Sequence, residues 1–320
     1  MHRRACMAAF ITPSSVSYDG VPPKLVYTCE EANLEESVLQ KFVQVCRDEE
    51  TTAYLERYCS GKESFWRSTV AHVTNYFLSR TDSNALVGRG QMFVLSTQQL
   101  RILLAFGNGG IKANTAQERS VGQPFDRLLD IGAGDGTVTE KFSPLVSHIT
   151  ATEVSSYMAK RLRERPFVDE VHECDNLDNI ASEFDMMCLL NVLDRCNEPS
   201  TLLHAMKERL VPVKGRLILA VVLPFCPFVE DGTKQKKPDQ DLDMDGGRCK
   251  QGATFEASVN TLINKVLIPH GFNIHAWTRV PYLCAGDDRQ QYYVLSDAIF
   301  VLSHDGGEQL ERPVCLSEVD

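Results

Sequence analysis

The fold of this 320-residue chain is decided by the stretch LLDIGAGDG, residues 128–136. The apolar run at residues 127–131 predicts a buried strand, and residues 137–143 predict the start of a helix. Glycines between a strand and a helix let the backbone turn tightly and approach a ligand closely. The stretch therefore predicts a ligand-binding turn in an α/β fold.

Strand-like and helical patterns alternate after this turn. Such alternation is typical of a parallel sheet with helices on both faces. Further strands are predicted at residues 148–153, 171–174, 184–190 and 215–222, and helices at 155–165, 199–210 and 255–270. Two last strands, 272–278 and 298–303, are expected on either side of a loop at 279–297. We expect an α/β fold with a seven-stranded, Rossmann-like, doubly wound sheet.

The N-terminal third of the chain has a different pattern. Residues 1 to about 30 show no periodicity and predict a flexible arm. Apolar residues then recur at helical spacing, which predicts a helical cap over 31–122, including a helix at 96–104 with Ser96 as its N-cap. The α/β domain is expected over 123–304, with a polar surface loop at 231–253 and a tail at 305–320.

Composition narrows the classes of partner and compartment. A net charge of -10 makes nucleic acid a poor partner and suits a basic peptide or a small molecule. The 11 cysteines include no C-x-x-C pair, so we expect no metal site, and reduced thiols in an intracellular protein. We expect no membrane span, because no apolar run reaches 18 residues, and a monomer. A cytoplasmic location and one associated with the endoplasmic reticulum or mitochondria both stay open.

The glycine spacing separates two kinds of cofactor. A dinucleotide fingerprint, G-x-G-x-x-G, would need glycine where Thr137 stands. The observed G-x-G-x-G, with Asp130 two places before Gly132, resembles motif one of the class I methyltransferases, which use S-adenosyl-L-methionine. An acidic flank also suits a sulfonium cofactor with an amino group better than a pyrophosphate.

The candidate cofactor residues lie at the ends of the first three predicted strands. They include Asp130, Gly132 and Gly134 in the glycine stretch. Glu153 closes the second strand, at the position that contacts the ribose in such folds, and its carboxylate can accept hydrogen bonds from both hydroxyls. Asp175, after the third strand, is expected to contact the adenine amine.

The methyl acceptor should meet the cofactor at the end of the strand over 184–190. Asn191 and Asp194 follow that strand, three positions apart, and no N-P-P-Y motif is present. Other interpretations stay open: Asp194 as the N-cap of the next helix, and Asn191 as a partner of strand-end backbone.

Five longer runs resemble one methyltransferase family. They are GRGQMF at 88–93, LNVLDRC at 190–196, VVLPFCPFVE at 221–230, TRVPYLCAGD at 278–287 and YYVLSDAIFVL at 292–302. They are similar to the DREV family of protein-histidine pros-methyltransferases, over about residues 35–303. Cys226 departs from the histidine of the relatives, and the N-terminal arm lacks their apolar signal-like segment.

The resemblance implies a reaction: transfer of a methyl group from S-adenosyl-L-methionine to the Nδ1 nitrogen of histidine in His-x-His motifs of proteins. The products would be 1-methylhistidine and S-adenosyl-L-homocysteine. The cofactor contacts implied are Glu153, Asn191, Tyr282, Arg89 and Gly90. The implied catalytic residues are Asp194 and Tyr293, and Asn191, Phe225 and Arg279 would complete the substrate site.

This chemistry gives Asp194 a definite task. Attack from Nδ1 requires the imidazole proton on Nε2, and a carboxylate that accepts this N–H fixes the tautomer. Strand alternation allows only one of Tyr292 and Tyr293 to face the site, and Arg279 could instead pair with Asp287. The alternatives are a methyltransferase for a small molecule or another side chain, and a non-catalytic cofactor-binding module. A dinucleotide oxidoreductase is a distant third, because of Thr137.

Overall fold

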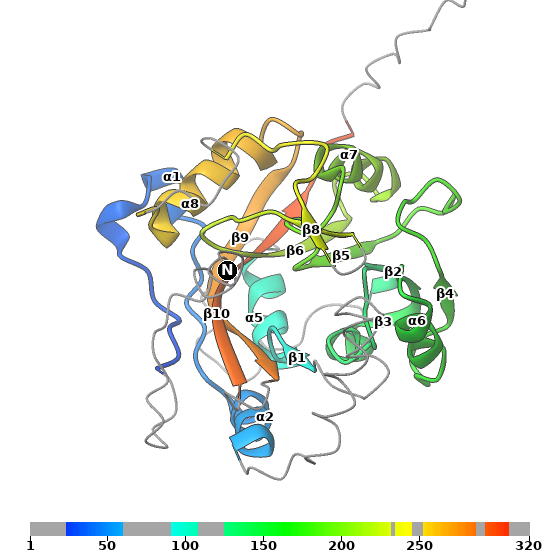
Figure 1. Cartoon of the computed structure of the whole chain (residues 1–320). Helices are drawn as coiled ribbons and strands as arrows, with labels where there is room; N and C mark the ends of the chain where they lie inside the picture. Colours follow the sequence, from blue (N-terminus) through cyan, green and yellow to red (C-terminus); the bar gives the residue numbers. More distant parts are fainter. Residues whose placement is uncertain are drawn as a thin grey trace, which may run out of the picture.

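The computed structural model describes residues 24–59, 91–107, 125–231, 234–244, 252–285 and 292–306. Its centre is an eight-stranded sheet in the order β1-β9-β10-β6-β5-β2-β3-β4, shown in Figure 1. The strands are β1 (Met92–Phe93), β2 (Phe125–Ile131), β3 (Val146–Thr152), β4 (Glu170–His172), β5 (Met186–Leu190), β6 (Arg216–Val222), β9 (Asn273–Ala285) and β10 (Tyr292–Ser303).

The strand order confirms the doubly wound α/β fold. The five strands β2 to β6 pair in parallel. The parallel part begins with β2 in the middle. β3 and β4 follow on one side of β2, and β5 and β6 lie on the other side. The antiparallel pair β9 and β10 completes the seven expected strands, and the short β1 adds an eighth beside β9.

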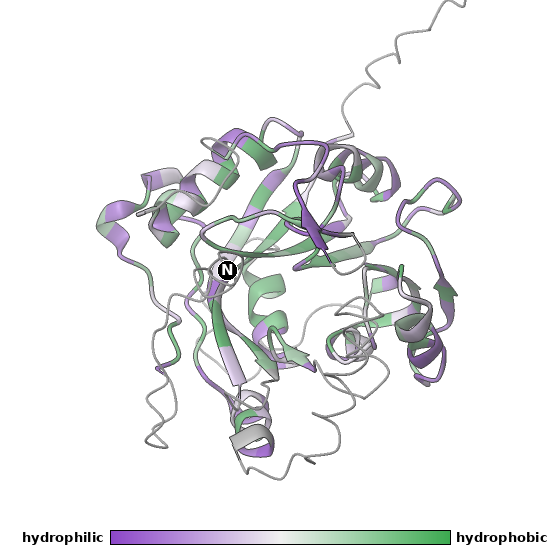
Figure 2. Cartoon of the chain, in the orientation of Figure 1, coloured by the Kyte–Doolittle hydropathy of each residue, from purple (hydrophilic) through white to green (hydrophobic). Residues whose placement is uncertain are grey.

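Helices cover both faces of this sheet, and their apolar sides turn toward it (Figure 2). Below one face lies a core with α7 and α8, and below the other a core with α5. The helices are α1 (Glu36–Leu39), α2 (Glu49–Cys59), α5 (Thr97–Gly107), α6 (Ser156–Arg163), α7 (Pro199–Arg209) and α8 (Phe255–Thr261), which continues as a π-helix over Leu262–Leu267. Three 3-10 helices cover Glu31–Asn33, Thr139–Lys141 and Ser143–Leu145.

Two local predictions for this domain are wrong. The helix expected at residues 137–143 is two 3-10 turns, since Pro144 lacks the amide hydrogen that a continuous helix needs. The loop expected at 279–297 is mostly strand. β9 and β10 pair along their length, from Tyr292 opposite Ala285 to Ser303 opposite Asn273. This strand contains Pro281, and proline is tolerated on the unpaired side of a strand. In the described chain, Pro281 pairs with Ser296 alone.

The described part of the N-terminal segment packs against β9 instead of forming an arm and an all-helical cap. Tyr27 is buried, which corrects the flexible-arm prediction for residues 24–30. Phe42 bridges to Trp277 in parallel, and the Trp277 indole N–H donates to the carbonyl of Val38 at 2.7 Å. The described helices in this segment are short, and the rest of the predicted cap lies partly outside the described residues.

Two further expectations need correction. The predicted surface loop at 231–253 begins with a two-stranded ribbon, β7 (Val229–Asp231) and β8 (Lys234–Lys236), and buries Leu242. Cys226 is disulfide-bonded, so the thiols are not all reduced. Among the described helices, none is long and apolar enough to cross a membrane.

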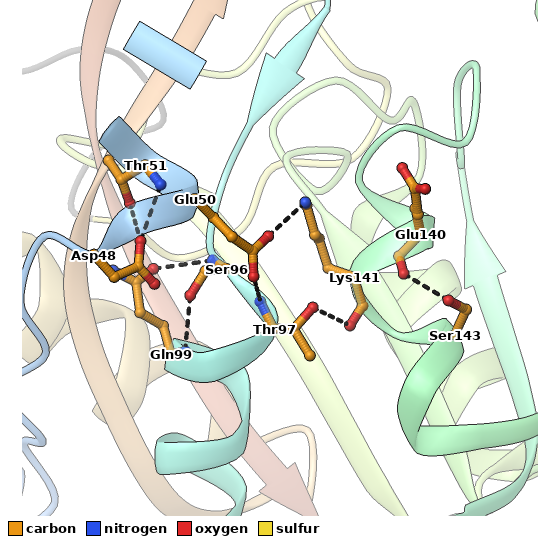
Figure 3. Close-up of polar contacts among 9 residues, drawn as sticks. All are labelled: Asp48, Glu50, Thr51, Ser96, Thr97, Gln99, Glu140, Lys141 and Ser143. Atoms are coloured by element: carbon orange, nitrogen blue, oxygen red, sulfur yellow. Dashed lines mark hydrogen bonds and ion pairs between the residues drawn. The ribbon is translucent and has the colours of Figure 1, made fainter. Parts of the chain in front are cut away.

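Figure 3 shows how the start of α5 joins the N-terminal segment to the α/β domain. The Ser96 hydroxyl accepts from the backbone N–H of Gln99 at 2.9 Å. The side-chain oxygen of Gln99 accepts from the backbone N–H of Ser96 at 3.0 Å. This reciprocal capping box confirms Ser96 as the N-cap. Glu50 of α2 accepts from the Thr97 amide and from Lys141, which follows the glycine loop.

We expect the Ser96→Ala substitution to lower the free energy of unfolding by roughly 0.5–2 kcal/mol, because an N-cap hydroxyl is lost from a buried helix start. Ser143→Ala, which removes an exposed hydroxyl, is the matched control. Urea denaturation followed by circular dichroism measures both. Equal stability of the two variants would contradict a stabilising role for this cap.

Candidate active site

The candidate site lies where the loops after β2 and β5 meet. In open α/β sheets, ligands bind outside the carboxyl ends of the strands, where the chain switches direction. Here that point is between β2 and β5, so the glycine loop faces the segment that begins at Asn191. An ideal Cβ on Gly132 would come within 2.6 Å of Val192, so residue 132 must be glycine for these two loops to touch.

The glycine loop has the backbone of a ligand cradle. Gly132, Gly134 and Gly136 have φ angles of 70°, 60° and 79°, in the left-handed region that favours glycine. No heavy atom lies within 4 Å of a Cβ built on Gly134, so the backbone there is open to close approach by a ligand.

Glu153 follows β3 and holds the cradle in shape. Its two carboxylate oxygens accept from the Gly134 amide at 2.9 Å and the Ser155 amide at 2.8 Å. Burial raises the pKa of Glu153, and these backbone amides oppose the shift. Glu153 therefore supports the glycine loop as well as being the predicted ribose contact. Its carboxylate oxygens keep further lone pairs that can accept from hydroxyl groups.

The other two acidic candidates differ in position. Asp130 is buried in β2, where its oxygens accept from the Thr139 hydroxyl at 2.6 Å and the Cys188 thiol at 3.0 Å. It therefore supports the loop from within the domain, and its predicted cofactor contact stays a prediction. Asp175 is exposed after β4 and accepts from the Asn176 side chain, and its adenine contact stays a prediction.

Asn191 and Asp194 lie together at the end of β5. Asn191 adopts a φ of 59°, and its side-chain amide donates to Asp297 of β10 at 2.8 Å. Asp194 is 2% exposed and forms an ion pair with Arg195 at 2.5 Å. The N-cap position of α7 is Glu198, so the helix-cap interpretation of Asp194 is wrong. Burial raises the pKa of Asp194 to about 6, against the opposing effect of the Arg195 guanidinium.

Three buried acceptors in this group have no donor among the described residues. They are the Oδ1 atoms of Asn191, Asp194 and Asp297. Leaving a buried polar atom unsatisfied costs roughly 1–3 kcal/mol, so such atoms in one place call for a ligand that brings N–H or O–H donors.

The pair β9 and β10 builds a wall beside these acceptors. Pairing of β10 with β6 ends at Asp297 and Val222, whereas pairing with β9 continues to Tyr292. Tyr282, predicted to contact the cofactor, lies in this extension and its hydroxyl contacts the Met92 sulfur. Tyr293 pairs with Cys284, so it shares the sheet face of Tyr282 and Asp297.

The register also settles which tyrosine faces the site. Tyr292 lies on the opposite sheet face, in a small cluster with Phe93 and Leu283. Tyr293, which the resemblance named, is on the face of the unpaired acceptors. Its catalytic role stays a prediction.

Several predicted residues are not brought to this face. Arg279 lies on the other face of β9, where it pairs with Glu256 at 3.4 Å and lies over the Phe255 ring. Phe225 is buried in the core with α7 and α8. Their predicted substrate contacts are therefore not supported by position. Arg89, Gly90 and Asp287 lie outside the described residues.

Two site residues were missed from the sequence. Arg195 was noted only as a member of the family run at 190–196. Its place directly after Asp194 in the sequence could have identified it as the ion-pair partner of that carboxylate. Asp297, 0% exposed, could have been noticed as a charged residue beside the apolar run of β10. No group of three or more potential metal ligands occurs in the described parts of the chain.

Comparisons with known proteins agree on methyl transfer. A family model described as DREV methyltransferase matches residues 26–304. The mitochondrial ubiquinone biosynthesis O-methyltransferase of Schizosaccharomyces pombe is 25% identical over 104 residues, 30% of this chain and 38% of that protein. Ribosomal RNA small subunit methyltransferase A of Haemophilus influenzae (strain PittEE) is 36% identical over 67 residues, 21% of this chain and 23% of that protein. The chain thus spans less than two fifths of these relatives.

Solved structures overlap the chain more broadly but loosely. A putative RNA methyltransferase from Pyrococcus horikoshii covers 77% of this chain and 100% of its own, with 13% identity and a TM-score of 0.40. A putative methyltransferase from Bacillus halodurans covers 58% and 94%, with 12% identity and a TM-score of 0.39. Overlaps at this level carry no argument, and the fold assignment depends on the strand order.

We expect Glu153→Gln to weaken S-adenosyl-L-homocysteine binding by tenfold or more. A glutamine has one acceptor oxygen for two backbone amides, and its NH₂ group would face a donor, at a cost of about 1–3 kcal/mol. Isothermal titration calorimetry measures the affinity. Glu170→Gln, an exposed change in the neighbouring strand, is the control. An unchanged affinity for Glu153→Gln would show that the cradle does not depend on this carboxylate.

Proposed function

The chain belongs to the DREV methyltransferase family, and we propose that it methylates the Nδ1 nitrogen of histidine in His-x-His motifs of proteins, with S-adenosyl-L-methionine as methyl donor. Methyl transfer follows from the family match. The choice of histidine is supported by the family runs in the sequence and, in the structure, by one observation: the Oδ1 of Asp194, after β5, is buried and has no donor among the described residues.

The described residues fit the cofactor. Gly134 offers an open backbone, and Glu153 beside it can take the ribose hydroxyls. Val154, 70% exposed directly after Glu153, offers an apolar surface for the adenine ring. Asn191 presents a free oxygen that can accept from the amino group. When bound, the cofactor supplies an electrophilic methyl group on a sulfonium.

Asp194 is suited to hold the acceptor ring. A neutral imidazole has one N–H and one lone pair, and the Asp194 Oδ1 can accept that N–H from Nε2. The bond leaves the lone pair on Nδ1 and fixes the ring angle. Because its pKa is about 6, Asp194 is ionised at neutral pH, as this role requires.

The same carboxylate favours the product side of the reaction. Methylation of Nδ1 makes the ring a cation, and a buried carboxylate within hydrogen-bond distance stabilises that charge. Arg195 pairs with the other oxygen, Oδ2, and so keeps Asp194 in place without using Oδ1. The cation–π contact of Arg195 with Phe228, 3.9 Å from the ring centroid, fixes the guanidinium in turn.

A methyltransferase for a small molecule is the second candidate. It is favoured by the curated relatives named for ubiquinone biosynthesis, which are O-methyltransferases. Because these relatives are named as mitochondrial, mitochondria are one of the compartments to test. A protein substrate without nucleic acid, and a monomeric enzyme, remain part of our proposal.

We expect labelled S-adenosyl-L-methionine to methylate a short peptide that contains Ala-His-Ala-His, with the label on Nδ1. Mass spectrometry and hydrolysis to 1-methylhistidine locate the methyl group, and His→Ala peptides are the controls. Label on Nε2 would keep the enzyme class but overturn the role of Asp194. Cofactor binding without label would point to small-molecule acceptors, and then to a binding module.

We expect Asp194→Asn to lose at least 100-fold in kcat while S-adenosyl-L-homocysteine still binds, because an amide cannot balance the imidazolium charge. Removal of one group that stabilises charge in a transition state typically lowers kcat by about 10²–10³. Asp185→Asn, at the opposite edge of the sheet, is the matched control. Near-normal turnover of Asp194→Asn would remove Asp194 from the mechanism.

A further inference from the structure

Asp297 is a second acidic residue of this site. It lies in β10, opposite Val222 at the carboxyl end of β6, and is 0% exposed. Its Oδ2 accepts from the Asn191 side-chain amide at 2.8 Å, whereas its Oδ1 has no donor among the described residues. A fully buried carboxylate that accepts one hydrogen bond destabilises the fold, unless it is protonated or a ligand supplies further donors.

The contact with Asp297 decides how the Asn191 amide is turned. The NH₂ group of Asn191 points at the Asp297 carboxyl, so its carbonyl oxygen must point the other way, where it lacks a donor. The oxygen and nitrogen of a side-chain amide are nearly alike in shape, so they are assigned from their hydrogen-bond partners. Asp297 thus leaves the Asn191 oxygen as an acceptor for a ligand.

Among the described residues, the charges around Asp297 do not balance. Asp194 acts on it as a like charge, and Arg195 is the opposite charge that this part of the chain supplies. From β9, Tyr282 and Cys284 face it, and both are neutral at pH 7 because burial raises their pKa. With both carboxyl groups ionised, one guanidinium would face two negative charges, and a cationic ligand would restore the balance.

We propose that Asp297 is a positioning residue of the methyl-transfer site: it orients the Asn191 oxygen toward the cofactor and releases a proton when the positively charged cofactor binds. This inference rests on the proposed function for the cofactor, but not for the histidine acceptor. In the step, the O–H bond of Asp297 breaks, the electron pair stays on the carboxylate, and the proton passes to the buffer.

The proton is expected to be present before binding. Burial raises the pKa of Asp297 to about 8; the Asn191 bond opposes this shift, and the Asp194 charge adds to it. The folded pKa is thus above the ordinary value of 3.8, so the neutral form dominates at pH 7 and is lost as pH rises through about 8. A nearby cation lowers the pKa of a carboxyl group, so binding at pH 7 should release the proton.

Calorimetric titration at pH 7 in buffers of different ionisation enthalpy tests the proposal. It measures the protons released when S-adenosyl-L-methionine or S-adenosyl-L-homocysteine binds to the wild-type chain, to Asp297→Asn and to Asp185→Asn. We expect roughly half to one proton released by the wild type and by Asp185→Asn, and none by Asp297→Asn. Release with both ligands would assign the cation as the ammonium group, and release with the methionine form alone would assign it as the sulfonium.

Several outcomes would overturn the proposal. They are no proton release by the wild-type chain, the same release by Asp297→Asn, and no binding of either ligand to the wild type. The wild-type result is decisive even if Asp297→Asn fails to fold, which circular dichroism would show. Absence of peptide methylation together with Asp297-dependent release would instead refute the histidine acceptor and leave this inference standing.

Discussion

β2 and β5 pair in parallel, with Asp130 beside Cys188 and Ile131 beside Leu189, so the loops that follow them must share one edge of the sheet. The chain reaches β5 only after it has built β3 and β4 on the other side. In open α/β sheets, ligands bind where such a crossover separates the loops that follow two neighbouring strands. The crossover places two parts of the candidate site: the glycine cradle on one side, and Asn191 and Asp194 on the other.

The candidate site brings together two carboxyl groups that are shielded from solvent. Asp194 and Asp297 are both buried, and Arg195 pairs with the first of them. In a site of low dielectric constant, such an imbalance is worth much more than at the surface. The proposed reaction moves one positive charge from a sulfur to a ring nitrogen, and a buried carboxylate beside that path would stabilise the charge throughout.

Local signals in the sequence predicted the parts of the site that lie next to a turn. The glycine spacing, Glu153 and the Asn191–Asp194 pair were all identified because each directly follows a strand. Asp297 was missed because its partner Asn191 is distant in sequence, and only the pairing of β10 with β6 brings them together. The positions of Arg279 and Tyr293 likewise depend on the register of β9 and β10, which no local pattern in the sequence defines.

The docking of the N-terminal segment on β9 has an optical consequence. Trp277 is fully enclosed, its ring centroid is 4.7 Å from that of Phe42, and its N–H is held by the Val38 carbonyl. Indole emission shifts to longer wavelength when water reaches the ring, so release of residues 38–43 from β9 would redden the fluorescence of Trp277. The protein thus carries an intrinsic reporter of this attachment, on the strand that also bears Tyr282.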